Sequence, residues 1–158
     1  MDGKKDLYLN FVAATAPVSP YKTWIDNYPA ITGSDRNPDA DPDKDGIRNA
    51  IEYVLGSSPN NAADGLDKLP VAAKSGSDFL FTFERAQNTT DATVRIEVGT
   101  TTASFPTTYA VGLVYNGGVP EVTYPTSPNI GWTGVKLTVP AGTRNFARLY
   151  VDVTLPPP

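Results

Sequence analysis

Twelve residues between Asp41 and Glu52 carry the strongest chemical signal in the sequence. Their order, DPDKDGIRNAIE, places aspartates at the first, third and fifth positions, glycine at the sixth and glutamate at the twelfth. This spacing is that of a calcium-binding loop, in which alternate carboxylates on a tightly curled segment converge on one point. Glycine permits the turn, the residue at position seven supplies its backbone carbonyl, and the glutamate binds through both oxygens. The predicted ligands are Asp41, Asp43, Asp45, Ile47 and Glu52.

Calcium is the cation that this set of ligands favours. All of the predicted ligands are oxygens, and a set of about seven suits calcium better than magnesium, which prefers octahedral geometry and retains its own waters. Asn49, at the ninth position, is expected to act through a water molecule. The alternative interpretation is a solvated acidic turn that caps the following helix. Capping explains one aspartate near a helix N-terminus, but not three at a spacing of two followed by a glutamate at position twelve.

The segment before the loop continues the same alternation and is a candidate second metal site. Its oxygen-bearing residues are Asp35, Asn37 and Asp39. Ala40 stands where a second loop of this kind would need glycine, and Pro38 and Pro42 stiffen the chain. We therefore expect a rigid acidic segment that leads into the calcium loop, with a second ion as the alternative.

Composition excludes most enzymatic chemistry. The 158 residues contain no histidine and no cysteine, which removes histidine-based nucleophile activation, thiol chemistry and the common zinc sites. The formal charge is −4, and five of the 17 acidic residues fall between 35 and 45, so a nucleic-acid partner is not expected. No apolar run is long enough to span a bilayer. We expect a non-enzymatic protein whose cofactor is calcium.

Two short helices should position the loop. Tyr21, Trp24, Ile25 and Tyr28 recur at helical spacing, and residues 47–55 form a second apolar stripe that ends at Gly56. Residues 6–13 alternate as a strand, and prolines near 16–20 indicate a linker. The predicted organisation is a strand and linker from a preceding region at 1–16, a helix–calcium loop–helix unit at 17–62, and a β-domain at 63–158.

The rest of the chain has the pattern of a mainly β protein. Short runs alternate apolar and polar residues from about residue 70, and turn residues separate them. The segments 109–115 and 119–124 flank Asn-Gly-Gly, which predicts that they form a hairpin. About six such strands favour an antiparallel β-sandwich, carrying the N-terminal loop–helix, EF-hand-like calcium unit.

The run WIDNYPAITGSDRNPDADPDKDGIRNAIEYVLGSSPNN also resembles a known class of segment. It is similar to thrombospondin type-3 repeats and dockerin half-sites in secreted proteins of Verrucomicrobia and Planctomycetes, and the resemblance covers residues 21–61. Ser58 stands where the turn after the helix in that class has aspartate, so no further ligand is implied there. The stretches LFTFERA and NFARLYV resemble the C-terminal β-domain of large surface or autotransporter-like proteins of these bacteria. The resemblance implies a structural, export or anchoring module at the bacterial cell surface or outside the cell, with no catalytic residues.

Two alternatives involve other residues. A calcium-stabilised carbohydrate-binding or adhesion module would use exposed aromatic rings, and the candidate glycan contacts are Trp132 and Tyr115, with Tyr109 and Tyr124 also available. The partner would then be a glycan or another surface protein. An enzyme would need paired carboxylates such as Glu84 with Glu97, or Glu121 with Asp152. These acids lie on the polar phase of their strands, so we expect them on a solvated sheet face.

Overall fold

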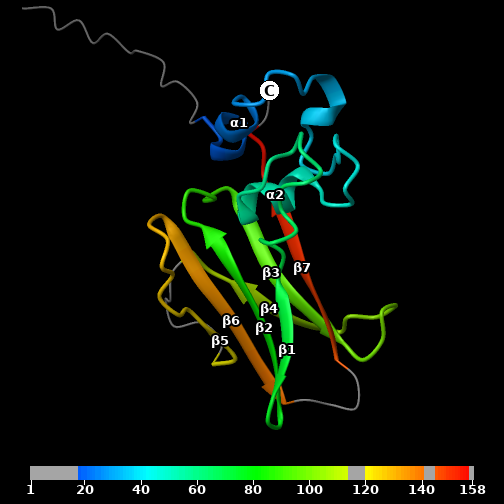
Figure 1. The fold of residues 1–158 in the computed structure, drawn as a ribbon, viewed down its shortest axis with the longest axis vertical. Helices are drawn as coiled ribbons and strands as arrows, with labels where there is room; N and C mark the ends of the chain where they lie inside the picture. Colours follow the sequence, from blue (N-terminus) through cyan, green and yellow to red (C-terminus); the bar gives the residue numbers. More distant parts are fainter. Residues whose placement is uncertain (1–17, 114–119, 141–144, 157–158) are drawn as a thin grey trace, which may run out of the picture.

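The structure is a computed structural model that describes residues 18–113, 120–140 and 145–156 (Figure 1). Its helical elements all precede its strands. They are α1 (Pro20–Ile25), the 3₁₀ helix η1 (Gly33–Arg36) and α2 (Asn49–Leu55). The predicted strand at 6–13 lies outside the described residues.

In the described part of the chain, seven strands form two antiparallel sheets, which confirms the mainly β class (Figure 1). The four-stranded sheet has the order β1-β2-β6-β5, and the three-stranded sheet has the order β4-β3-β7. Their bounds are β1 (Val71–Ser75), β2 (Asp78–Ala86), β3 (Ala92–Gly99), β4 (Thr107–Val111), β5 (Val122–Thr123), β6 (Trp132–Pro140) and β7 (Phe146–Val153).

Alternating residues of the central strands build the core. Every second side chain of a strand points to the same face, so an apolar phase on each strand can be buried while the other phase meets solvent. Phe81 and Phe83 on β2 are buried, as are Val94, Ile96 and Val98 on β3. β6 and β7 supply the other main core residues, Val135, Leu137, Val139 and Val151. These are the apolar phases that the sequence predicts.

The prediction of a hairpin around Asn-Gly-Gly is wrong. The turn residues lie outside the described part of the chain, but the flanking strands do not pair with each other. β4 pairs with β3 in one sheet, whereas β5 pairs with β6 in the other. β4 and β5 therefore belong to different sheets. An Asn-Gly pair indicates a tight reversal, but the sheet partner is chosen by packing over long sequence distances.

The helical segment caps one end of the sandwich (Figure 1). α2 contacts both β2 and β7, one strand from each sheet. Its C-terminus is closed by Gly56, whose φ of 72° is the left-handed conformation that favours glycine. Buried residues of both helices, including Tyr21, Ile25 and Tyr53, belong to the same hydrophobic cluster as the sandwich core. The helical segment and the strands therefore share one core.

Asp91, the last residue before β3, ties the helices to the strands. Its carboxylate accepts hydrogen bonds from the Ser19 hydroxyl and from the Tyr21 amide, at 3.0 Å for the latter. The Tyr53 hydroxyl donates to the other oxygen at 2.8 Å. Ser19 in turn caps α1 by accepting from the Lys22 amide. One side chain thus holds both helices against the sandwich.

Two charged side chains are buried contrary to the expected pattern. Glu97, predicted to be solvated, is 7% exposed because Arg95 and Arg148 form ion pairs with its two oxygens. Arg85 is 2% exposed on the apolar phase of β2 and donates to the carbonyls of Val111, Thr89 and Ala92. Both side chains are buried because residues from other strands or loops satisfy them.

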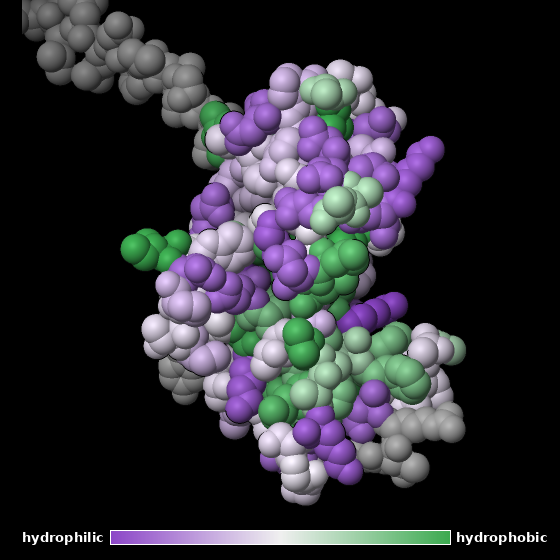
Figure 2. Space-filling view, viewed as in Figure 1, coloured by the Kyte–Doolittle hydropathy of each residue, from purple (hydrophilic) through white to green (hydrophobic). Residues whose placement is uncertain are grey.

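Figure 2 shows that hydrophilic residues dominate the helical end, whereas apolar residues gather over the strands below it. An open cleft with a mainly apolar lining, to which Ile51, Leu69 and Leu149 contribute, lies beside α2. Among the described residues, no helix is both long and apolar enough to cross a membrane.

Candidate metal centre

The three aspartates of the predicted loop converge. Asp41, Asp43 and Asp45 each place a carboxylate oxygen so that the three atoms lie within 4.8 Å of one another. The backbone curls because Lys44 and Gly46 adopt positive φ values of 63° and 90°. This is the conformation that the glycine at position six predicts.

Backbone amides hold the aspartates in place. Lys44 and Gly46 donate to the two oxygens of Asp41, at 2.8 and 3.0 Å. The Ile47 amide donates to Asp45 Oδ1 at 2.7 Å, and the Asp45 amide donates to Asp43 Oδ1 at 3.3 Å. These bonds use one oxygen of Asp43 and one of Asp45, and the second oxygen of each side chain accepts no hydrogen bond.

Glu52, the predicted twelfth-position ligand, is fully buried on α2. Its Oε1 accepts one long hydrogen bond, 3.5 Å, from the buried Ser57 hydroxyl, and its Oε2 has no hydrogen-bond partner. Burial, followed by the negative charges of Asp43, Asp45 and Asp41, raises the pKa of Glu52 to about 8. Glu52 is not one of the carboxylates whose oxygens lie within 4.8 Å of one another, but the charges of those aspartates act on it. Burial also raises the pKa of Asp43.

The charge of this cluster is not balanced by the protein. Among the described residues, no lysine or arginine forms an ion pair with Asp41, Asp43, Asp45 or Glu52. The buried side-chain atoms without hydrogen-bond partners in that part of the chain all fall within the twelve-residue loop: Asp43 Oδ2, Asp45 Oδ2, Asn49 Oδ1 and Glu52 Oε2. Buried charged oxygens without partners are expensive. The three clustered aspartates fit a divalent cation, and the buried, unpartnered Glu52 whose pKa their charges raise is the candidate fourth carboxylate.

Two further loop positions, Ile47 and Asn49, have different environments from each other. Ile47 is buried, as predicted for position seven. Asn49 does not face the aspartates with its amide nitrogen, which instead donates to the carbonyls of Asp35 and Asn37 at 2.7 and 2.8 Å. Asn49 therefore braces the preceding segment against α2, and this role was not apparent from the sequence.

The candidate second site is not assembled as a carboxylate cluster. Asp39 forms an ion pair with Arg48, which supplies the positive charge that a metal would otherwise provide. Asp35 and Asn37 accept hydrogen bonds through their backbone carbonyls. This geometry is that of a braced acidic lead-in to the loop.

The structure describes three of the four candidate glycan contacts. Tyr115 is outside the described residues. Tyr109 and Tyr124 pack against the core, and the Tyr124 hydroxyl accepts from the Gly112 amide at 2.8 Å. Trp132, expected in an exposed turn, instead begins β6 and is partly buried against Gly56. Of these aromatics, Trp132 lines a groove on the four-stranded sheet.

Comparison of the chain with protein-family models, with curated proteins and with solved structures finds no match. The resemblance of residues 21–61 to thrombospondin type-3 and dockerin segments therefore stays a prediction. The functional interpretation depends on the geometry of the loop.

Proposed function

We propose that this protein binds one calcium ion through the carboxylates of Asp41, Asp43, Asp45 and Glu52 and the carbonyl of Ile47. The observation that carries the proposal is the environment of Glu52. Its side chain is 0% exposed, one oxygen has no partner, and the charges of the three clustered aspartates, which have no cationic partners, act on it. A divalent ion at this point would offset two of the negative charges and supply the missing partner for each orphaned carboxylate oxygen.

Calcium suits these ligands better than magnesium does. Carboxylates and a backbone carbonyl are the hard oxygen ligands that calcium prefers, and a loop of flexible carboxylates tolerates its seven- or eight-fold coordination. Magnesium demands a tighter octahedral shell and dehydrates reluctantly. The ion's role would be structural, since neither histidine nor cysteine is available for other chemistry.

The site lies where the ion can stabilise the whole fold. Glu52 belongs to α2, which contacts one strand of each sheet, and Tyr53 next to it is bonded to Asp91. Binding would therefore fix the helix that joins the loop to the sandwich. A ligand present at 100 times its dissociation constant stabilises a native protein by about 2.7 kcal/mol.

We further propose that the chain is a non-enzymatic structural module of a larger bacterial protein that acts outside the cell or at its surface. Calcium loops of moderate affinity are filled by the high calcium concentrations found there. The resemblance of the loop to segments of secreted proteins supports the same location. The proposed place of the chain at the C-terminal end of the parent protein comes from the other resemblance, that of LFTFERA and NFARLYV to a C-terminal β-domain.

Isothermal titration with calcium and with magnesium tests the proposal. We expect one calcium ion per chain for the wild type, much weaker magnesium binding, and no measurable calcium binding for Asp45→Asn. Asp39→Asn is the matched control, because it also removes one acidic charge near the loop but from a side chain paired with Arg48. Wild-type calcium affinity in Asp45→Asn, or loss of binding in Asp39→Asn alone, would refute the assigned ligands.

A further inference from the structure

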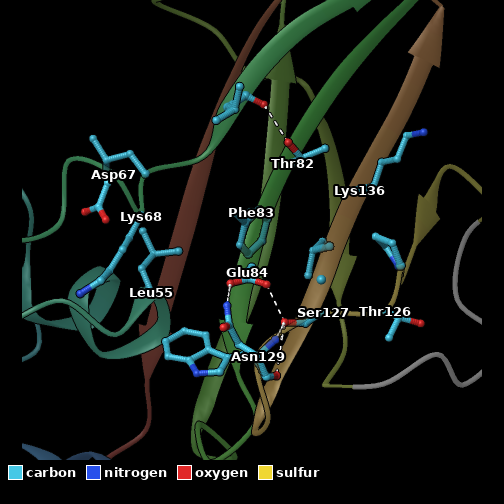
Figure 3. A pocket seen from close by; sticks show the side chains of 16 residues that line it. Leu55, Asp67, Lys68, Thr82, Phe83, Glu84, Thr126, Ser127, Asn129 and Lys136 are labelled. Carbon is cyan, nitrogen blue, oxygen red and sulfur yellow. Dashed lines mark hydrogen bonds between the residues drawn. The ribbon is translucent and has the colours of Figure 1, made fainter.

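A groove of about 580 Å³ runs over the outer face of the four-stranded sheet (Figure 3). Its floor is formed by β2 and β6, whose antiparallel register places Thr82 opposite Lys136 and Glu84 opposite Gly134. One wall is formed by the end of α2 and the segment 67–71, and the other by the segment 125–129. The groove is separate from the calcium loop.

Gly134 allows the second wall to approach the sheet. A side chain at this position would meet the Pro125 carbonyl oxygen at 2.5 Å, which is closer than any real contact. The segment 125–129 can therefore lie directly against β6. The groove is shaped by this close approach and by the absence of a side chain opposite Glu84.

Hydrogen bonds fix the polar groups of the groove before any ligand binds. Glu84 accepts from the Ser127 hydroxyl at 2.5 Å and from Asn129 Nδ2 at 2.8 Å, one bond to each oxygen (Figure 3). The backbone amide of Asn129 also donates to Ser127 Oγ at 3.0 Å. A carboxylate can accept about four hydrogen bonds, so Glu84 keeps acceptor capacity, and Asn129 Nδ2 keeps a second hydrogen. Preorganised groups of this kind lose little entropy on binding.

An aromatic side chain flanks these polar groups. The turn from Asn129 to Trp132 is closed by the Trp132 amide, which donates to the Asn129 carbonyl at 3.3 Å, and Gly131 has a φ of 85° within it. The far end of the indole ring lies against Gly56, where a side chain would meet it at 2.1 Å. Trp132 is thus held in place and still lines the groove.

The charges of the groove do not favour an anionic polymer. The residues that line the groove carry two positive charges, on Lys68 and Lys136, and two negative charges, on Asp67 and Glu84. Lys68 is also committed, because its Nζ donates to the Gly56 carbonyl and to Asp64, both at 2.9 Å. Hydroxyls of Thr82, Thr126 and Ser127 make the surface too polar for a purely apolar ligand.

We propose that this groove binds a neutral oligosaccharide segment of a polysaccharide. A sugar ring has an apolar face of C–H groups that can pack on the Trp132 indole, and hydroxyls at its edge that can bond Glu84 and Asn129. The Ser127 hydroxyl orients Glu84, and Glu84 in turn holds the Asn129 side chain. The proposal does not depend on calcium binding, because none of the calcium ligands lines the groove.

Affinity gel electrophoresis of the whole chain in calcium-containing buffer tests the proposal. The gels contain hydroxyethylcellulose, xyloglucan, galactomannan or laminarin as neutral polymers, and heparin or polygalacturonate as anionic ones. We expect retardation by at least one neutral polymer and weaker or no retardation by the anionic ones. Retardation by none of the neutral polymers, or stronger retardation by the anionic ones, would overturn the proposal.

Three variants locate the site. Trp132→Ala should abolish retardation, and Asn129→Ala should weaken it about fivefold, the effect of losing one ordinary hydrogen bond. Asn129 is exposed, so its variant keeps the test valid if Trp132→Ala proves unstable. Tyr150→Ala removes an aromatic ring from the other sheet and should bind as the wild type does. Undiminished retardation of Asn129→Ala, or its loss in a folded Tyr150→Ala, would contradict the assignment.

Discussion

Replacing Glu52 by glutamine should have opposite effects in chelator and in calcium. The substitution keeps the shape of a fully buried side chain but removes its negative charge. It also removes the two-oxygen ligand that a calcium loop needs at position twelve. A negative charge on this buried side chain destabilises the fold when no cation is bound, but calcium binding requires it. Melting the variant in chelator and in calcium therefore distinguishes a metal ligand from an ordinary buried acid.

The size of the effect in chelator follows from the pKa of Glu52. It is raised to about 8 by burial and then by the charges of Asp43 and Asp45, whereas a glutamate in an unfolded chain has a pKa of about 4.3. The folded protein therefore binds the proton more tightly, so stability is full below pH 4 and falls as the pH rises toward 8. At pH 7 the loss is on the order of 3 kcal/mol, since each pH unit above the unfolded-state pKa is worth about 1.4 kcal/mol.

Calorimetric melts at pH 7 measure both arms of this prediction. In chelator, Glu52→Gln should melt about 6–12 °C above the wild type, at about 2–4 °C per kcal/mol for a chain of this size. Calcium should raise the melting temperature of the wild type and leave that of Glu52→Gln unchanged. Glu121→Gln, a control distant from the loop in sequence, should respond to calcium as the wild type does. A Glu52→Gln protein that is destabilised in chelator, or that gains as much from calcium as the wild type, would refute the reasoning.

Other substitutions test the parts around the site. Gly46→Val keeps every ligand but strains a residue at φ 90°, so titration should show lost calcium affinity; unchanged affinity would contradict the assigned turn. Asp91→Ala removes an acceptor of three hydrogen bonds between helices and strands, and urea denaturation should show a loss of about 2–4 kcal/mol; a loss under 1 kcal/mol would refute that role. Hydrogen bonding from Arg95, and then from Arg148, holds the pKa of Glu97 below its usual range. The stabilisation that Glu97 provides is therefore present above pH 4 and is lost as the pH falls through its lower folded-state pKa. Glu97→Gln should therefore flatten the acid side of a stability–pH profile, and an unchanged profile would argue against the ion pairs.

The features that could be predicted from the sequence are those set by short-range spacing. The twelve-residue loop fixes its own curvature through Gly46, and the strand phases of β2 and β3 follow from strict alternation. The end of α2 at Gly56 is equally local, since only the conformation of that residue decides it.

The features that could not be predicted depend on partners distant in the chain. Glu97 is buried because Arg148, 51 residues away, reaches it across neighbouring strands. Arg85 is tolerated in the interior because carbonyls of β3, β4 and a loop face it. The groove beside Trp132 arises from the approach of segment 125–129 to Gly134, which no local pattern indicates.

A crystal structure determined in calcium, with the ion located by anomalous scattering, tests the central claim most directly. It should show one ion bound by the carboxylates of Asp41, Asp43 and Asp45, the Ile47 carbonyl and both oxygens of Glu52, at about 2.3–2.6 Å. An ion held by Asp35 and Asp39 instead, or a Glu52 side chain that points away from the bound calcium, would contradict the account.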